Sequence, residues 1–282
     1  MLIRTSLLSA LTVIGVWTAA TPVNAQALLP YVLPLDTERL EEQGLALAQE
    51  AAQLAQLQQF ELALAQAQLA SQLVPDSAAV WGLLGSLYLQ FEEFDASIEA
   101  LNRAKALEAD NSAVLFALGT AHFRQGDYEQ ASDFLESGLA IEPENPGALF
   151  DLGNTYFKLN EFDAAIARYQ KSVDLDPEFW PSVNNIGLVE YEQGDIDGAI
   201  ARWEESLSIA PEEPEPELAI AVAKFSQGEE SAALDLGIAA LEKDSRYADI
   251  QFLIDNLWGP ELIADTEVFF EHPDVQAILV QL

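Results

Sequence analysis

Apolar and small residues return along this chain every 34 residues, and within each period they fall at helical spacing. In the clearest period, Trp81-Gly82-Leu83-Leu84-Gly85-Ser86-Leu87-Tyr88 places large apolar residues on one face of a helix around a glycine. A turn and a second helical stretch follow in every period. Each period therefore predicts a pair of helices that cannot bury its apolar face alone and must stack on its neighbours.

Three columns of residues define the period. The first column holds a small residue in the first helix of each period (Ala51, Gly85, Gly119, Gly153, Gly187, Ala221). The second column holds a small residue in the second helix (Ala63, Ser97, Ala131, Ala165, Ala199, Ala233). The third column is mostly proline (Pro75, Ala109, Pro143, Pro177, Pro211, Ser245). Small residues let two helices approach closely, and proline ends the second helix.

This pattern resembles the tetratricopeptide repeat, because Trp81 to Tyr88 reproduce the motif W-x-x-L-G-x-x-Y. The resemblance implies an all-α fold, a right-handed α-solenoid of six helix-turn-helix repeats with a C-terminal helical cap. The repeats cover residues 44–247 (44–77, 78–111, 112–145, 146–179, 180–213 and 214–247).

The turn inside each repeat carries glycine or asparagine followed by an acidic residue, as in Gly126-Asp127 and Asn160-Glu161. Glycine and asparagine accept the left-handed conformation that ends a helix, and the acidic residue favours the start of the next one. We expect the two helices of each repeat to be separated at these places.

Residues 1–25 have the features of a segment for export. Arg4 supplies a positive start, Leu7 to Val16 are mostly apolar, and Val23-Asn24-Ala25 suits signal peptidase, so the mature chain is expected to begin at Gln26. The alternative is an uncleaved membrane anchor, because the apolar stretch is only a little short for a bilayer. Both interpretations place the protein across or at a bacterial membrane, in the periplasm or at the thylakoid.

Two further segments flank the repeats. In the N-terminal segment, residues 26–43, residues 31–35 are expected to be extended and Asp36 to cap a long first helix. Residues 248–282 predict capping helices, whose apolar residues at helical spacing would cover the exposed end of the last repeat (Ile250, Leu253, Ile254, Leu257, Trp258).

The charge of the chain limits its partners. With 47 acidic and 12 basic residues the formal net charge is -35, which disfavours nucleic acid and anionic lipid as partners. Contact with a membrane is therefore expected only through the N-terminal segment, if it is not cleaved. The chain has no cysteine and two histidines, and His122 occupies a place where other repeats carry a core tyrosine. We expect no metal, no cofactor and no enzymatic activity.

The first helices supply the candidate binding surface, which is the inner face of the repeats. Aromatic and asparagine side chains alternate there, and they suit the side chains and backbone of an extended or helical protein segment. Arg124 and Lys158 could together hold a carboxylate, although Phe150 stands where carboxylate-binding repeats carry lysine. The alternative is that some of these aromatics pack in the core. The expected groove residues are Phe116, Thr120, Phe123, Arg124, Phe150, Asn154, Phe157, Lys158, Asn184, Leu188, Tyr191 and Phe225.

Short flanking segments resemble a cyanobacterial and plastid tetratricopeptide family that includes Pitt, which interacts with protochlorophyllide oxidoreductase. They are residues 31–35, 179–188, 245–249 and 256–259. This resemblance implies a non-enzymatic scaffold or assembly factor for photosynthetic or pigment-biosynthesis complexes at the thylakoid. The alternative is a periplasmic subunit of an envelope complex that docks through its C-terminal cap, with Trp258, Phe269 and Phe270 as contacts.

Overall fold

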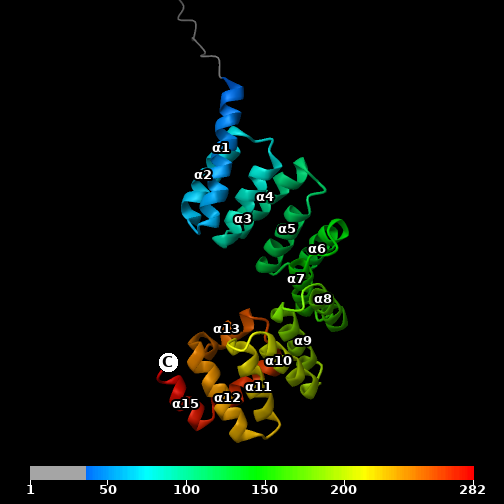
Figure 1. Ribbon diagram of the computed structural model, residues 1–282, viewed down its shortest axis with the longest axis vertical. Coiled ribbons are helices and arrows are strands. Elements are labelled where there is room, and N and C mark those ends of the chain that lie inside the picture. Colours follow the sequence, from blue (N-terminus) through cyan, green and yellow to red (C-terminus); the bar gives the residue numbers. More distant parts are fainter. Residues whose placement is uncertain (1–35) are drawn as a thin grey trace, which may run out of the picture. The chain divides into compact units, whose positions relative to one another are not determined.

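The computed structural model describes residues 36–282 (Figure 1). The expected signal peptide or anchor at residues 1–25 and the expected extended segment at 31–35 lie outside the described residues. The chain divides into two units, residues 1–37 and 38–282, and the second unit contains the repeats. Among the described residues there are fifteen α-helices, one 3₁₀ helix and no strand.

The helices form six consecutive hairpins. Their bounds are α1 (Thr37–Gln56) with α2 (Phe60–Leu73), α3 (Ala78–Gln90) with α4 (Phe94–Leu107), α5 (Ser112–Gln125) with α6 (Tyr128–Ile141), α7 (Pro146–Lys158) with α8 (Phe162–Leu175), α9 (Trp180–Glu192) with α10 (Ile196–Ile209), and α11 (Pro214–Ser226) with α12 (Glu230–Lys243). From α3 to α12 the two helices of each hairpin pack together, and each second helix packs against the next first helix. The expected all-α solenoid of stacked repeats is confirmed.

The small-residue columns are explained by close helix packing. A Cβ on Gly153 would lie 2.4 Å from the ring of Tyr169, and a Cβ on Gly187 would lie 2.6 Å from the indole nitrogen of Trp203. The Trp203 indole N–H also donates to the backbone carbonyl of Asn184 at 3.1 Å. Glycine at these places therefore makes room for a large ring from the second helix of the same repeat.

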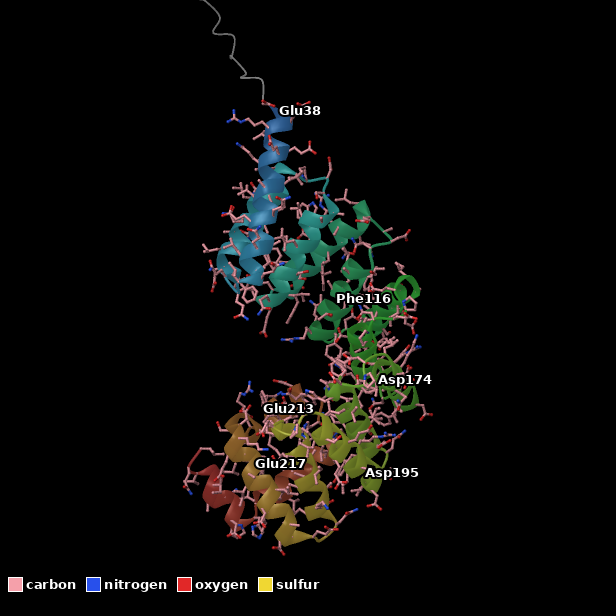
Figure 2. The ribbon with its side chains drawn as sticks, in the orientation of Figure 1. Glu38, Phe116, Asp174, Asp195, Glu213 and Glu217 are labelled. Carbon is pink, nitrogen blue, oxygen red and sulfur yellow. The ribbon has the colours of Figure 1, made fainter. Side chains whose placement is uncertain are left out.

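Local signals set the helix ends as the sequence predicts. Gly126 and Asn160 have φ values of 86° and 60° in the turns of two successive repeats. The side chains of Asn111 and Asn145 accept hydrogen bonds from backbone N–H groups at the starts of α5 and α7. Acidic side chains such as that of Asp174 are exposed on the repeats (Figure 2). Within residues 36–282, no helix combines the length and apolar character needed to cross a bilayer.

The C-terminal segment forms the expected helical cap and also reaches the inner face of the repeats. It forms η1 (Ser245–Ala248), α13 (Ile250–Asp255), α14 (Pro260–Phe270) and α15 (Pro273–Leu279). α15 packs on α12, but α14 packs on α11 and α9, the first helices of the last two repeats. The segment therefore does more than cover the end of the array, because one of its helices occupies the inner face of repeats five and six.

Candidate functional site

The expected groove is closed over the last two repeats. Asn184, Leu188 and Tyr191 are buried, and Phe225 is half-buried with its ring 5.3 Å from that of Phe269 on α14. The Tyr191 hydroxyl donates to the carboxylate of Asp265, also on α14. These four groove residues are open to a partner in the sequence prediction but not in the structure, where the sixth repeat and α14 cover most of their surface.

Glu192, at the end of α9, holds the beginning of α14. Its carboxylate oxygens accept hydrogen bonds from the backbone N–H groups of Glu261 at 3.2 Å and Leu262 at 3.1 Å. These are N–H groups of the first helical turn, which have no partner within the helix. Burial raises the pKa of Glu192, and the two backbone hydrogen bonds oppose that shift.

Glu215, at the start of α11, fixes the segment before α14. Its buried carboxylate accepts hydrogen bonds from Asn184 at 3.1 Å, the Trp258 indole at 3.3 Å and the Tyr247 hydroxyl at 3.5 Å. Burial raises the pKa of Glu215 to about 7, although all three donors act in the opposite direction. α9, α11 and the C-terminal segment are thus joined through one carboxyl group.

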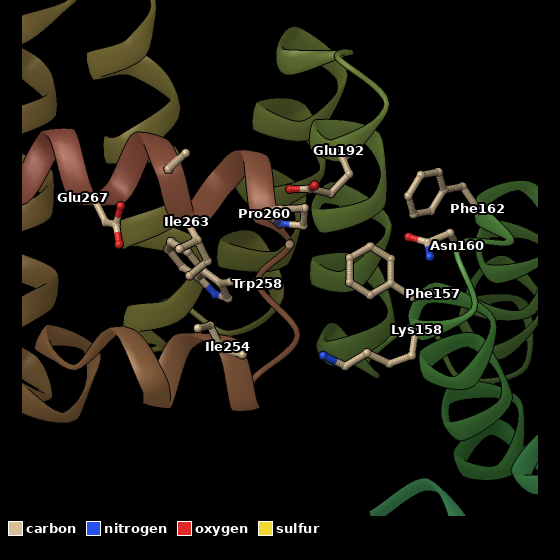
Figure 3. Close-up of a pocket in the computed structure, with 12 residues that line it drawn as sticks. Phe157, Lys158, Asn160, Phe162, Glu192, Ile254, Trp258, Pro260, Ile263 and Glu267 are labelled. Carbon is tan, nitrogen blue, oxygen red and sulfur yellow. The ribbon is translucent and has the colours of Figure 1, made fainter. Parts of the chain in front are cut away.

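The end of α7, the end of α9 and the segment α13–α14 enclose a pocket of about 490 Å³, here called the α14 pocket (Figure 3). Its apolar lining comes mainly from the repeats on one side and the C-terminal segment on the other (Phe157, Phe162, Ile254, Trp258, Ile263). Ile254 was expected to cover the end of the last repeat, but the residue is 37% exposed. It lies at the edge of this pocket instead.

Lys158 is the basic residue of the α14 pocket. Its side chain is half-buried and extends along one edge of the pocket towards Ile254 (Figure 3). Burial lowers the pKa of Lys158, and the charge of Asp255 opposes that shift. Glu192 and Glu267 add carboxylates to the lining. An apolar side chain of a partner can enter this pocket while Lys158 donates to a carbonyl or carboxylate oxygen near it.

A second pocket of about 160 Å³, here called the Asp151 pocket, lies between α5 and α7. Four of its six lining residues belong to the expected groove (Thr120, Phe123, Arg124, Asn154). Arg124 is exposed and pairs with Glu92 at 3.0 Å, whereas Lys158 lines the other pocket. Arg124 and Lys158 were expected to hold one carboxylate together. In the structure they line different pockets, so they are not placed to do so.

The remaining groove residues have mixed positions. Phe116 and Phe150 are half-buried, and the Phe150 ring lies 5.8 Å from that of Tyr169 and 5.4 Å from that of Phe179. Asn154 is buried, and its side-chain oxygen accepts hydrogen bonds from Tyr169 at 2.8 Å and Asn185 at 2.9 Å. Phe157 is also buried, apart from the edge that lines the α14 pocket. Core packing, the alternative given by the sequence, accounts for much of this set.

Two contributions to these pockets were not predicted from the sequence. Asp151 is a carboxylate within a largely apolar helix, and this contrast is visible in the sequence. Ile263 and Ala264 line the α14 pocket from a helix whose docking position no repeat pattern specifies. The three cap residues that were expected to be docking contacts, Trp258, Phe269 and Phe270, are buried and do not form an exposed apolar surface.

Comparison with protein families gives two matches. The model of the cytochrome c-type biogenesis protein H TPR domain matches residues 35–179, slightly more than half of the chain. A tetratricopeptide repeat model matches residues 150–214. No curated protein sequence matches the chain. The resemblance of the flanks to the family that includes Pitt is not confirmed by these comparisons.

Several solved structures have the same fold. The crystal structure of MamA is 25% identical, with a TM-score of 0.53 over 58% of this chain and 96% of that one. YrrB, described as a TPR protein with an unusual peptide-binding site, is 18% identical, with a TM-score of 0.54 over 64% of this chain and 92% of YrrB. Pseudomonas aeruginosa pilF is 15% identical, with a TM-score of 0.62 over 87% of this chain and 99% of pilF.

Proposed function

The chain belongs to the tetratricopeptide repeat family of the cytochrome c-type biogenesis protein H TPR domain, and from this premise we propose that it is a non-enzymatic assembly factor that binds a protein segment along the inner face of its repeats. Stacked repeats present such a face as a continuous surface for a partner. The proposed surface runs along the first helices to α7 and ends at α14, which occupies the inner face beyond that point.

The observation that carries this proposal is the α14 pocket. Its volume of about 490 Å³ and its apolar lining suit one large apolar side chain of the partner as the anchor. Lys158 would donate to an oxygen of the same segment, beside the anchor. The name of the matched family supports assembly of c-type cytochromes as the setting. The comparisons give no support to a role in pigment biosynthesis.

Filling the α14 pocket is expected to weaken partner binding strongly. Ala264 is exposed on α14 and lines the pocket, so Ala264→Phe places a ring in the space of the anchor without opening the core. Affinity capture from the native cells, with quantification of the co-purified proteins, should show at least about a tenfold loss of the specific partner, equivalent to about 1.4 kcal/mol.

The matched control is Val268→Phe. Val268 is 57% exposed on the same helix and does not line the pocket. This variant adds the same ring to the surface and should recover as much partner as the wild type. Circular dichroism spectra establish that both variants are folded. Equal partner recovery by all three proteins would contradict binding at this pocket.

We also propose that the protein works on the exported side of a bacterial membrane. The support is the sequence of residues 1–25, with its apolar stretch and its signal-peptidase pattern at Val23-Asn24-Ala25. Intact-mass analysis of the protein from native cells is expected to find Gln26 as the first residue. Retention of residues 1–25 in the membrane fraction would indicate an anchor. Retention of them in the soluble cytoplasmic fraction would contradict export altogether.

A further inference from the structure

The carboxylate of Asp151 shares its hydrogen-bond donor with a second acceptor. Its nearest donor is the Thr120 hydroxyl, 3.3 Å away, and the same hydroxyl lies 3.1 Å from the backbone carbonyl oxygen of Phe116. A hydroxyl has one proton, so these two acceptors share it. The Asp151 side chain is half-buried and lines the pocket between α5 and α7. Its lone pairs are thus available to a donor that enters this pocket.

The charges around the Asp151 pocket favour a cation. Arg124 also lines the pocket, but its guanidinium pairs with Glu92 on the preceding repeat at 3.0 Å. Within residues 36–282 no ion pair involves Asp151. Burial raises the pKa of Asp151 to about 6, so the group is still mostly ionised at neutral pH. A partly desolvated carboxylate attracts an incoming cation more strongly than an exposed one does.

Asp151 and the α14 pocket lie along one helix. Asp151 and Lys158 are seven residues apart on α7, so they share a face, separated by a rise of about 10 Å at 1.5 Å per residue. An extended chain advances about 3.3 Å per residue and covers that distance in about three residues. One extended segment can therefore reach both pockets.

We propose that the Asp151 pocket binds a lysine or arginine side chain of the same partner segment whose apolar side chain enters the α14 pocket. The partner segment would then be extended and carry a basic residue about three positions from a large apolar one. The net charge of -35 also favours a basic partner. The apolar half of this motif rests on the proposed function, and the basic half rests on Asp151.

Synthetic peptides test the motif. The probes are peptides of about twelve residues with a lysine three positions before a phenylalanine, the same peptides in reverse order, and counterparts with norleucine in place of lysine. Binding is measured by fluorescence anisotropy near pH 7.5. In at least one orientation, the wild-type protein is expected to bind the lysine peptide at least about tenfold more tightly than its norleucine counterpart, since close, partly desolvated charge pairs at interfaces contribute this much.

Two variants test whether Asp151 causes the preference for lysine over norleucine. Asp151→Asn keeps the shape of the side chain but removes its charge, and it should bind lysine and norleucine peptides equally. Asp174→Asn, at an exposed position on α8 (Figure 2), is the matched control and should keep the wild-type preference. Absence of a preference in the wild type, or its persistence in Asp151→Asn, would overturn the basic half of the motif alone. If no peptide binds, or if Ala264→Phe leaves binding unchanged, the proposed function fails and this inference fails with it.

Discussion

Phe269→Ala is expected to lower the free energy of unfolding of the last two repeats by about 3–5 kcal/mol, the usual cost of truncating a buried phenylalanine. Phe269 is 0% exposed, and its ring packs against Phe225 and lies over Gly237. It thereby fastens α14 to both helices of the sixth repeat. Truncating the ring leaves a cavity at the centre of that attachment.

Val268→Ala is the matched control for this experiment. Val268 precedes Phe269 but is 57% exposed, so its truncation should change stability by about 0.5 kcal/mol or less. Urea denaturation compares the two variants, and hydrogen exchange locates the effect. Protection should fall in α9, α11, α12 and α14 and persist in α3 to α6, because each repeat contacts mainly its neighbours. A similar loss in both variants, or a uniform loss along the chain, would contradict the assigned role of α14.

Stability is expected to fall as the pH rises from 5 to 8, with Glu215 as the largest single cause. Its pKa rises from an ordinary 4.5 to about 7 on folding, so between these values the folded state binds more protons than the unfolded state. Stability decreases with pH wherever that is so. A shift of this size corresponds to a loss on the order of 3 kcal/mol, at 1.36 kcal/mol per pKa unit. Burial of Asp151, whose pKa rises to about 6, acts in the same direction.

Glu215→Gln isolates this contribution. Glutamine keeps a carbonyl oxygen that can accept from Asn184 and Trp258, its amide can donate to the Tyr247 hydroxyl, and it does not titrate. The variant should therefore have a flatter dependence of stability on pH and exceed the wild type in stability at pH 8. Thermal unfolding at four pH values and constant ionic strength measures this. The exposed Glu212→Gln is the control, and parallel curves for wild type and Glu215→Gln would exclude Glu215 as the cause.

The sequence predicted those residues of the candidate site that lie on the first helices of the repeats. Phe157 and Lys158 line the α14 pocket, and Thr120, Phe123 and Arg124 line the Asp151 pocket, because the place of a residue within a repeat fixes the direction of its side chain. Leu188 and Tyr191 occupy equivalent places in the fifth repeat and were predicted on the same basis. Both are buried in the structure, and Tyr191 contacts Asp265 on α14, 74 residues further along the chain.

By itself, the sequence determined the repeat architecture of this protein. The 34-residue period, the small residues at Gly153 and Gly187 and the turn residues at Gly126 and Asn160 are all local signals, and neighbouring repeats interact in the same way each time. Only the tertiary structure decided where α14 docks, and with it the length of the open inner face and the α14 pocket. That docking depends on single long-range contacts, such as those of Glu192 and Glu215, which do not recur along the chain and so leave no periodic pattern to interpret.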